Sequence, residues 1–376
     1  MSAAREADVV VVGGGIVGAS VAYGLARKGR SVVLLDEGDD AFRAARGNFG
    51  LVWVQGKGAG APHYARWTMR SAAGWSALAR DLADETGIDV QLTQPGGFHL
   101  CLNEGELAER RSILTGLRTA LDGDYPFELL DHAATARLCP HIGPGVVGAS
   151  FGPLDGHVNP LRLLRALLQA FAQRGGQLAA GHKVVSIARN AGMFDVATEA
   201  GRFQASRLVL TAGLGNRGLA PMVGLEAPVD PNRGEILVSE RLQPFLHHPT
   251  AHVRQTGDGG VQLGDSKEDV GFDDRTARAE LARIADRAVR MFPLLGRVNV
   301  VRAWGALRVM TADGLPIYET SASHPGAYVV TCHSGITLAA VHADALSDWI
   351  LGGAQPQEIA PLVAARLKHV QKTSHH

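Results

Sequence analysis

The beginning of the chain constrains the fold more than any other segment. An apolar run at residues 8–12 leads into Gly13, Gly15 and Gly18, and a helical pattern occupies residues 19–26. Gly13 permits a tight turn, Gly15 lets backbone N–H groups approach a ligand with no Cβ in the way, and Gly18 lets the helix lie close to the strand. This order of strand, glycine turn and helix predicts a site for the pyrophosphate of a dinucleotide.

A second strand and an acidic residue follow at the spacing that such a site requires. The apolar run 31–35 ends at Asp36, 18 positions after Gly18. A carboxylate at this place accepts hydrogen bonds from a ribose 2′-OH and disfavours a 2′-phosphate. We therefore expect an α/β fold in which a parallel sheet carries a dinucleotide-binding unit.

Composition excludes several classes of protein. The length of 376 residues predicts two closely packed domains, and the 37 basic residues balance the 37 acidic ones, so no general attraction to nucleic acid or anionic lipid is expected. No apolar run is long enough to cross a bilayer. The three cysteines are far apart, which favours neither a disulfide framework nor a cysteine metal cluster. Since no signal-peptide pattern is found, we expect a cytoplasmic protein. We also expect no metal site.

The remaining pattern is discontinuous. We expect helices at residues 62–86, 104–120, 161–171, 276–292 and 336–351, and strands at 183–189, 193–198, 204–211, 236–238, 252–255, 261–263 and 328–331. Asn159 is the expected cap of the third helix, with Pro160 at its first position. The strand that ends at Thr211 runs into Ala212 and Gly213, which indicates a return of the chain to the nucleotide-binding sheet.

Seven segments occur in an order that is typical of one family. They are VVVVGGGIVGAS at 9–20, LLDEGD at 34–39, DGHVNP at 155–160, LVLTAGLGN at 208–216, RGEILV at 233–238, WGALRVMTADGLPI at 304–317 and CHSGITLAAVHADALSDWI at 332–350. With them, nearly the whole chain resembles the FAD-dependent amine and amino-acid oxidoreductases of the D-amino-acid oxidase, glycine oxidase and sarcosine oxidase type, the DAO family. The segment GNFGLVWVQGKG at 47–58 is most similar to the FAD-carrying β subunits of heteromeric dehydrogenases that act on opines, D-hydroxyproline or, with cyanide release, glycine.

The resemblance implies an FAD-binding Rossmann-like domain of the GR2 type and a substrate domain built on an antiparallel α+β sheet. We place the FAD-binding domain at residues 1–60, 145–218 and 302–376, and the substrate-binding domain at 61–144 and 219–301. Each domain is thus assembled from stretches that are distant in sequence.

The resemblance also implies which side chains form the substrate site. Arg308 corresponds to the arginine that holds the substrate carboxylate, a task for which a planar guanidinium is suited because it donates two parallel hydrogen bonds. A salt-bridged or surface arginine is the alternative. Further candidates, each of which a structural role would also explain, are Gln55, Arg254, His333, His252 and Glu235.

The expected cofactor contacts come from the glycine turn, the early loop, the middle strands and the C-terminal helix. They are Gly13, Gly15, Ile16, Val17, Gly18, Asp36, Glu37, Arg46, Gly47, Asn48, Phe49, Gly50, Leu51, Val184, Thr211, Ala212, Gly213, Gly305, Arg308, Ser334, Gly335, Ile336 and Thr337. The N–H groups of residues 335–337 are expected to face the flavin N1–C2=O edge and to stabilise the reduced ring. Helix capping by Ser334 and Thr337 explains these two residues equally well.

Two departures from the family pattern concern cysteine and lysine. Sarcosine oxidases carry their flavin-linking cysteine in the segment that matches 307–313, and this chain has none there, so we expect noncovalent FAD. Where they place a lysine over the flavin, this chain has Gln262, and the missing cation predicts slow reaction with oxygen. We expect Lys57 to be a solvated loop lysine, with a charge directed at the site as the alternative.

The implied reaction is oxidation of the C–N bond of an amino acid or secondary amine. A neutral amine drives hydride transfer from the α-carbon to flavin N5, water hydrolyses the resulting imine, and electrons pass to an acceptor other than oxygen. Partner subunits are expected, with FMN at a subunit interface as an open alternative. A hydrogen-peroxide-forming oxidase and an FAD-carrying electron-relay subunit are the other functions that we consider. An NAD-dependent dehydrogenase would leave the segments at 304–317 and 332–350 without a role.

Overall fold

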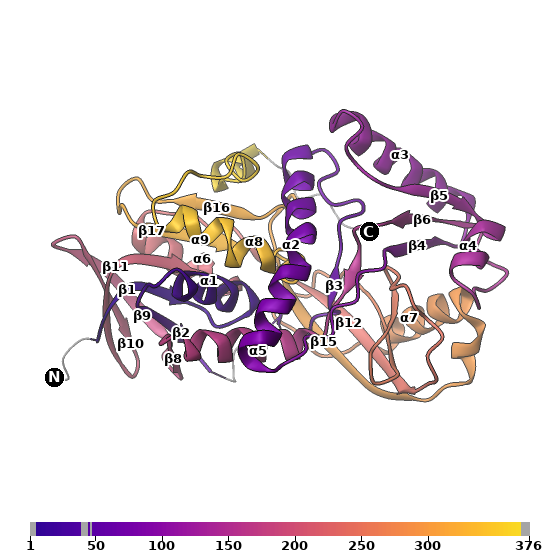
Figure 1. Ribbon diagram of the computed structural model, residues 1–376, viewed down its shortest axis with the longest axis horizontal. Helices are drawn as coiled ribbons and strands as arrows, with labels where there is room; N and C mark the ends of the chain where they lie inside the picture. The colour runs from indigo at the N-terminus through magenta and orange to yellow at the C-terminus, as the bar shows by residue number, and fades with distance from the viewer. Residues whose placement is uncertain (1–4, 39–43, 46, 370–376) are drawn as a thin grey trace.

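The computed structural model describes residues 5–38, 44–45 and 47–369. A mainly parallel sheet lies on one side of the elongated molecule and antiparallel sheets lie on the other, with the long helix α2 (Pro62–Thr86) between them (Figure 1). The parallel sheet runs in the order β16, β17, β11, β1, β2, β8, formed by Ile317–Thr320, Ala327–Thr331, Gly201–Leu210, Arg5–Val12, Val32–Asp36 and Gln177–Ala180. An antiparallel hairpin of β9 (Val184–Asn190) and β10 (Met193–Thr198) is paired with β11.

Strand β1 is the centre of this sheet. It pairs in parallel with β2 on one side and with β11 on the other, so the expected return of the chain to the sheet is confirmed. Successive side chains of a strand point to opposite faces. Val9 and Val11 accordingly join the core that contains helix α1 (Ile16–Arg27), while Val10 and Val12 join a second core on the side of β9 and β10. Helices α5 (Pro160–Gln173), α8 (Ala339–Ala343) and α9 (Ala345–Ile350) pack against α1.

The antiparallel part contains two larger sheets and one small one. The first sheet has the order β13, β14, β12, β15, formed by Val253–Gln255, Gly260–Leu263, Asp230–Arg241 and Val300–Met310. The second has the order β4, β6, β5, formed by Gly97–Cys101, Gly148–Gly152 and Glu128–Asp131. Between the two parts, β3 (Leu51–Val52) pairs with β7 (Gly156–His157). The remaining helices are α3 (Glu104–Ala120), α4 (His132–Leu138), α6 (Asn216–Leu219) and α7 (Arg278–Met291).

The expected helices were correct where local signals are strong. Helices α2 and α3 have the expected bounds, and the side chain of Asn159 accepts hydrogen bonds from the first N–H groups of α5. The single helix expected at 336–351 is wrong, because the chain forms turns up to Leu338 and then two short helices that are separated at Asp344. At Asp344 the backbone adopts φ −120° and ψ −90°, which no α-helix accommodates.

At two of the proposed domain limits, strands of one sheet are assigned to different domains. Strand β15 pairs along its length with β12, although the limit at 301/302 divides β15. Strand β6 pairs with β4 and β5, although the limit at 144/145 assigns it to the other domain. The domain limits stay a prediction. Among the described residues, the helices include none with the length and apolar character of a membrane span.

Candidate cofactor and substrate site

The carboxyl ends of β1, β2, β11 and β17 open into one cavity of about 900 Å³. Strands β12 and β15 of the antiparallel sheet form the opposite wall. Ligands of open α/β sheets bind outside the carboxyl ends of the strands, and small-molecule sites enclose roughly 300–1,000 Å³. The cavity therefore has the position and the size of a cofactor and substrate site.

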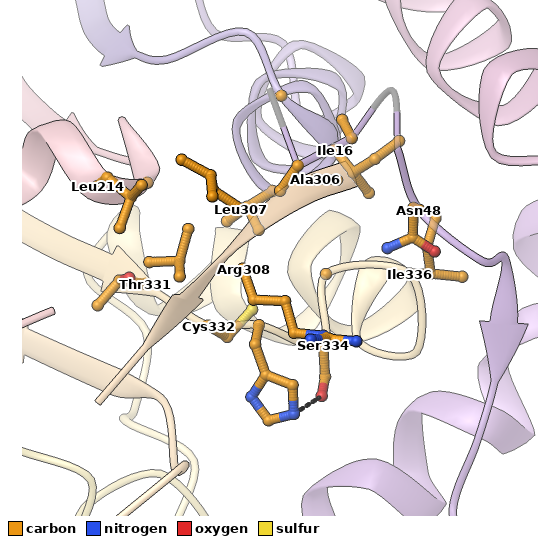
Figure 2. A pocket seen from close by; sticks show the side chains of 18 of the residues that line it. Ile16, Asn48, Leu214, Ala306, Leu307, Arg308, Thr331, Cys332, Ser334 and Ile336 are labelled. Carbon is orange, nitrogen blue, oxygen red and sulfur yellow. Dashed lines mark hydrogen bonds between the residues drawn. The ribbon is translucent and has the colours of Figure 1, made fainter. Parts of the chain in front are cut away.

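Most of the predicted site residues line this cavity. They are Gly13, Gly15, Ile16, Val17, Asp36, Glu37, Gly47, Asn48, Phe49, Leu51, Gln55, Val184, Thr211, Ala212, Gly213, His252, Arg308, His333, Ser334, Gly335, Ile336 and Thr337. Four separate parts of the sequence surround one space, represented by Ile16, by Asn48, by Arg308 and by Ser334 with Ile336 (Figure 2). Arg46 lies outside the described residues.

The glycine turn has the backbone that its sequence predicts. Gly13 has φ +106°, and a Cβ there would lie 2.6 Å from the carbonyl oxygen of Thr211. A Cβ at Gly18 would lie 1.8 Å from the carbonyl oxygen of Gly13, so only glycine lets α1 approach β1 this closely. Around Gly15 no atom lies within 4 Å of an added Cβ, which leaves this face of the turn open to the cavity.

Asp36 connects the end of β2 to the glycine turn. Its carboxylate accepts hydrogen bonds from the N–H of Gly14 at 2.8 Å and from the N–H of Gly38 at 2.9 Å. The residue also lines the cavity. These contacts hold an acceptor at the place where the sequence predicts recognition of a ribose hydroxyl.

Arg308 extends from β15 into the cavity, toward Ser334 in the view of Figure 2. Its guanidinium is anchored by Asp265, whose carboxylate oxygen lies 2.6 Å from Nη2, and Nη1 donates to Asn232 Oδ1 at 3.1 Å and to the carbonyl of Ser266 at 2.8 Å. The described part of the chain offers no partner to Nε. Arg308 is thus a rigidly held cation that keeps donor capacity for a ligand.

Lys57 is not the solvated loop lysine that the sequence suggested. It lines the cavity, and its Nζ donates a hydrogen bond of 2.6 Å to Ser334 Oγ. The Nε2 atom of His333 lies 3.1 Å from the same hydroxyl oxygen. Burial lowers the pKa of Lys57 to about 8. The alternative interpretation, a charge directed at the site, is therefore the one that the geometry supports.

The side-chain amide of Gln55 connects several neighbouring groups at the edge of the cavity. Its Nε2 donates to the carbonyl of Gly97 and to Asp155, and its Oε1 accepts from Ser150 and Arg110. The amide is therefore fully engaged by the described residues. Asp155 also accepts the N–H group of Gln55, and burial raises the pKa of this carboxyl to about 7.

Some predicted residues lie elsewhere. The wall of the first cavity, of about 900 Å³, does not include Gly18, Gly50, Gly305 or Arg254. Arg254, instead, lines a second cavity of about 1,090 Å³, where its Nε donates to Gln262 at 2.8 Å and its Nη1 lies 3.0 Å from His157 Nδ1. The Glu235 carboxylate contacts Arg233 and the N–H of Ala277, and Glu235 does not line the first cavity.

Other residues of the wall were not anticipated. His99, Arg110 and Lys267 line the cavity, from β4, from α3 and from the segment after β14. The sequence around them contains no motif, and only the packing of the antiparallel sheets brings them to the site. Cys332 lines it as well, and burial raises the pKa of its thiol to about 12.

The wall fits a flavin dinucleotide. The open face at Gly15 and the acceptor at Asp36 suit its pyrophosphate and ribose, and the segment 333–337 with Lys57 suits an acceptor edge that becomes anionic on reduction. A parallel sheet with this turn, facing an antiparallel sheet that presents an arginine, defines the class of the flavin-dependent oxidoreductases.

The comparisons agree with this class. A family model described as "FAD dependent oxidoreductase" (DAO) matches residues 8–349, and the chain belongs to this family. The chain is 45% identical, over 98% of its length and 99% of the relative, to an opine oxidase subunit of Agrobacterium tumefaciens. It is 29% identical to hydrogen cyanide synthase subunit HcnC of Pseudomonas aeruginosa, over 97% of each chain. The crystal structure of glycine oxidase from Geobacillus kaustophilus superposes with a TM-score of 0.89 over 99% of this chain and all of that one, at 24% identity, which shows the shared fold. The resemblance derived from the sequence is confirmed.

Proposed function

We propose that this protein oxidises the C–N bond of an opine, a secondary amine whose nitrogen joins two carboxylate-bearing carbon chains. The observation that carries the proposal is the presence of Arg308 in the same cavity as the glycine turn, because a guanidinium is suited to hold a substrate carboxylate close to the cofactor. The 45% identity to a relative named as part of an opine oxidase supports the substrate class.

The residues of the chain divide the work between cofactor and substrate. FAD, when bound, supplies the hydride acceptor. The turn at Gly13 and Gly15, together with Asp36, holds the dinucleotide, and Arg308 orients the substrate through one carboxylate. The surrounding wall excludes water from the reacting carbon.

The electron acceptor separates two candidate functions. We propose a dehydrogenase that delivers electrons to an acceptor other than oxygen, because Gln262 lines the second cavity and supplies no cation to the first. A hydrogen-peroxide-forming oxidase is the second candidate, and one observation favours it: Lys57 brings an ammonium group into the first cavity. Mixing the reduced protein with oxygen and following reoxidation of the flavin distinguishes the two.

We also propose that the chain acts within a heteromeric enzyme. Two relatives are named as subunits, and Val300 and Val301 on β15 are 51% and 63% exposed, as suits a surface that a partner covers. The second cavity, which Arg254 and Arg302 line, is the place in this chain to look for the phosphate of a second flavin such as FMN.

Anaerobic mixing of the FAD-loaded protein with N-(1-carboxyethyl) amino acids, simple amino acids and simple amines tests the function. We expect the opine-type compounds to bleach the flavin in the isolated chain. Bleaching by dithionite but by none of the amines would contradict the proposal, and bleaching only after a partner subunit is added would favour the electron-relay alternative.

A further inference from the structure

The wall of the first cavity carries more basic groups than the binding of one carboxylate requires. His99 on β4, Arg110 on α3 and His252 ahead of β13 all line it, and we name these three residues the distal cluster. Arg110 donates to the hydroxyl of Ser150, which is paired with His99 across β4 and β6. Residues opposite each other in an antiparallel pair point to the same face, so Arg110 and His99 lie on one side of this sheet.

Arg110 is a buried cation without an acid. Only 9% of the residue is exposed, and its hydrogen bonds go to two neutral groups, Ser150 at 3.4 Å and Gln55 at 3.2 Å. Within the described residues no carboxylate lies in ion-pair distance of its guanidinium, and Asp155 joins the network only through the amide of Gln55. Buried charges are normally paired, and a guanidinium held at a cavity wall by neutral groups is suited to an anion that enters from the cavity.

The side chains of the two histidines likewise have no hydrogen-bond partner among the described residues. Their rings pack edge to face with centroids 5.3 Å apart, and across the described chain neither ring forms a hydrogen bond. The Nδ1 atom of His252 is buried and unpaired. Burial holds the pKa of both rings below the usual value, to about 4 for His252, so each is neutral near pH 7 and retains one N–H donor.

The charge balance around the distal cluster favours an anion. Two carboxylates, those of Glu106 and Asp265, interact electrostatically with His252. Each already forms an ion pair with an arginine: Glu106 with Arg287 at 2.9 Å, and Asp265 with Arg308 at 2.6 Å. Lys267, on the same wall, adds positive charge. The region therefore has donors and positive charge in excess of its acids.

We propose that the distal cluster is a second anion-binding subsite, which receives the carboxylate on the far substituent of the amine nitrogen while Arg308 holds the carboxylate beside the oxidised carbon. The inference rests on the proposed function and deepens it. It gives the second carboxylate of the opine a place in the cavity, and Arg110 becomes the residue that distinguishes an opine from an N-alkyl amino acid.

Thioether analogues test the subsite without any turnover, because sulfur in place of the amine nitrogen removes the oxidisable bond. The FAD-loaded protein is titrated with a series of (carboxyalkylthio)acetates, which carry one to three methylene groups in the carboxyalkyl arm, and with (alkylthio)acetates of matched length. Perturbation of the flavin spectrum gives the dissociation constants. We expect the best diacid to bind at least about 10-fold more tightly than its alkyl counterpart, as charge-assisted hydrogen bonds provide.

Substitutions test whether the distal cluster causes the preference for the diacid. Arg110→Gln and His252→Asn are expected to bring the diacid-to-alkyl ratio close to 1, whereas Arg111→Gln, an exposed neighbour on the same helix, keeps it. Flavin content and melting temperature establish that each variant is folded. No preference in the unmodified protein, or a preference that survives both substitutions, overturns the subsite. Failure of the proposed function gives a different result from failure of the subsite. In that case the amines do not reduce the flavin, while the thioether titration still measures anion binding at the distal cluster.

Discussion

Lys57 and Ser334 are 277 positions apart in sequence and are joined by a hydrogen bond of 2.6 Å between Nζ and Oγ. The bond links the loop after β3 to the loop after β17, so both sides of the cavity meet at this point. An ammonium group held there is placed to stabilise negative charge that develops on a bound acceptor.

Replacement of Lys57 by Met is expected to slow reoxidation of the reduced protein by oxygen by about 10-fold or more, because a preorganised cation stabilises a developing anion. Burial lowers the pKa of Lys57 to about 8, so the ammonium form is lost as the pH rises through 8. In the unmodified protein the reoxidation rate should therefore fall over this range, and in the variant it should not. Stopped-flow mixing at several pH values measures it. Lys28→Met, at the end of α1, is the control, and a variant that reoxidises like this control would remove Lys57 from the reaction.

Arg308→Lys is expected to raise the substrate concentration needed for half-maximal flavin reduction by about 100-fold, since an ammonium group loses the paired donors of a guanidinium. FAD content should stay unchanged. Anaerobic stopped-flow reduction over a range of substrate concentrations gives the constant. Arg297→Lys, at an exposed arginine in the turn that precedes β15, serves as the matched control. Equal constants for both variants would exclude Arg308 as the carboxylate ligand.

Two glycine substitutions separate damage to the fold from damage to the cofactor site. In Gly18→Ala the new Cβ would meet the carbonyl of Gly13 at 1.8 Å, so we expect a strongly destabilised protein. In Gly15→Ala the Cβ would meet no protein atom within 4 Å, so we expect a folded protein that binds FAD poorly. Gly116→Ala, in open space on α3, should slightly stabilise. Melting temperature and flavin content are measured together. Full flavin content in Gly15→Ala would show that the turn does not contact the cofactor.

The parts of the fold that the sequence predicts are those that a single segment specifies. The glycine turn, the bounds of α2 and the cap at Asn159 depend on conformational freedom, periodicity and side-chain hydrogen bonds within a few residues. The long pairing of β12 with β15 was missed, because buried and exposed positions do not alternate regularly along either strand.

The site divides in the same way. Arg308 and Asp36 each lie within a segment that the sequence makes recognisable, and both line the cavity. Lys57 was misjudged because its environment is made by Ser334, which nothing in the loop sequence indicates. Arg110 was missed for a related reason: it lies on a helix with many charged residues, and only the fold shows that its side chain is buried.

FAD is expected to be held without a covalent bond even though Cys332 lines the cavity. Burial raises the pKa of this thiol to about 12, so the nucleophilic thiolate is scarce near neutral pH. Acid precipitation should release all of the flavin into the supernatant, and Cys332→Ser should behave in the same way. A yellow pellet from the unmodified protein, absent in the variant, would show a covalent link.

The buried carboxyl of Asp155 predicts how stability depends on pH. Burial raises its pKa from 3.8 to about 7, so between these values the folded protein binds a proton that the unfolded chain has released. Stability gained from this group is therefore present at low pH and is lost as the pH rises to about 7, beyond which it changes no further. Asp155→Asn cannot ionise, so the melting temperature of the unmodified protein relative to this variant should fall from pH 4.5 to pH 7. Glu109→Gln, exposed on α3, should leave the profile of the unmodified protein intact. Profiles of the unmodified protein and Asp155→Asn that run parallel would show that the carboxylate is already charged at low pH, stabilised by the N–H groups of Val54 and Gln55.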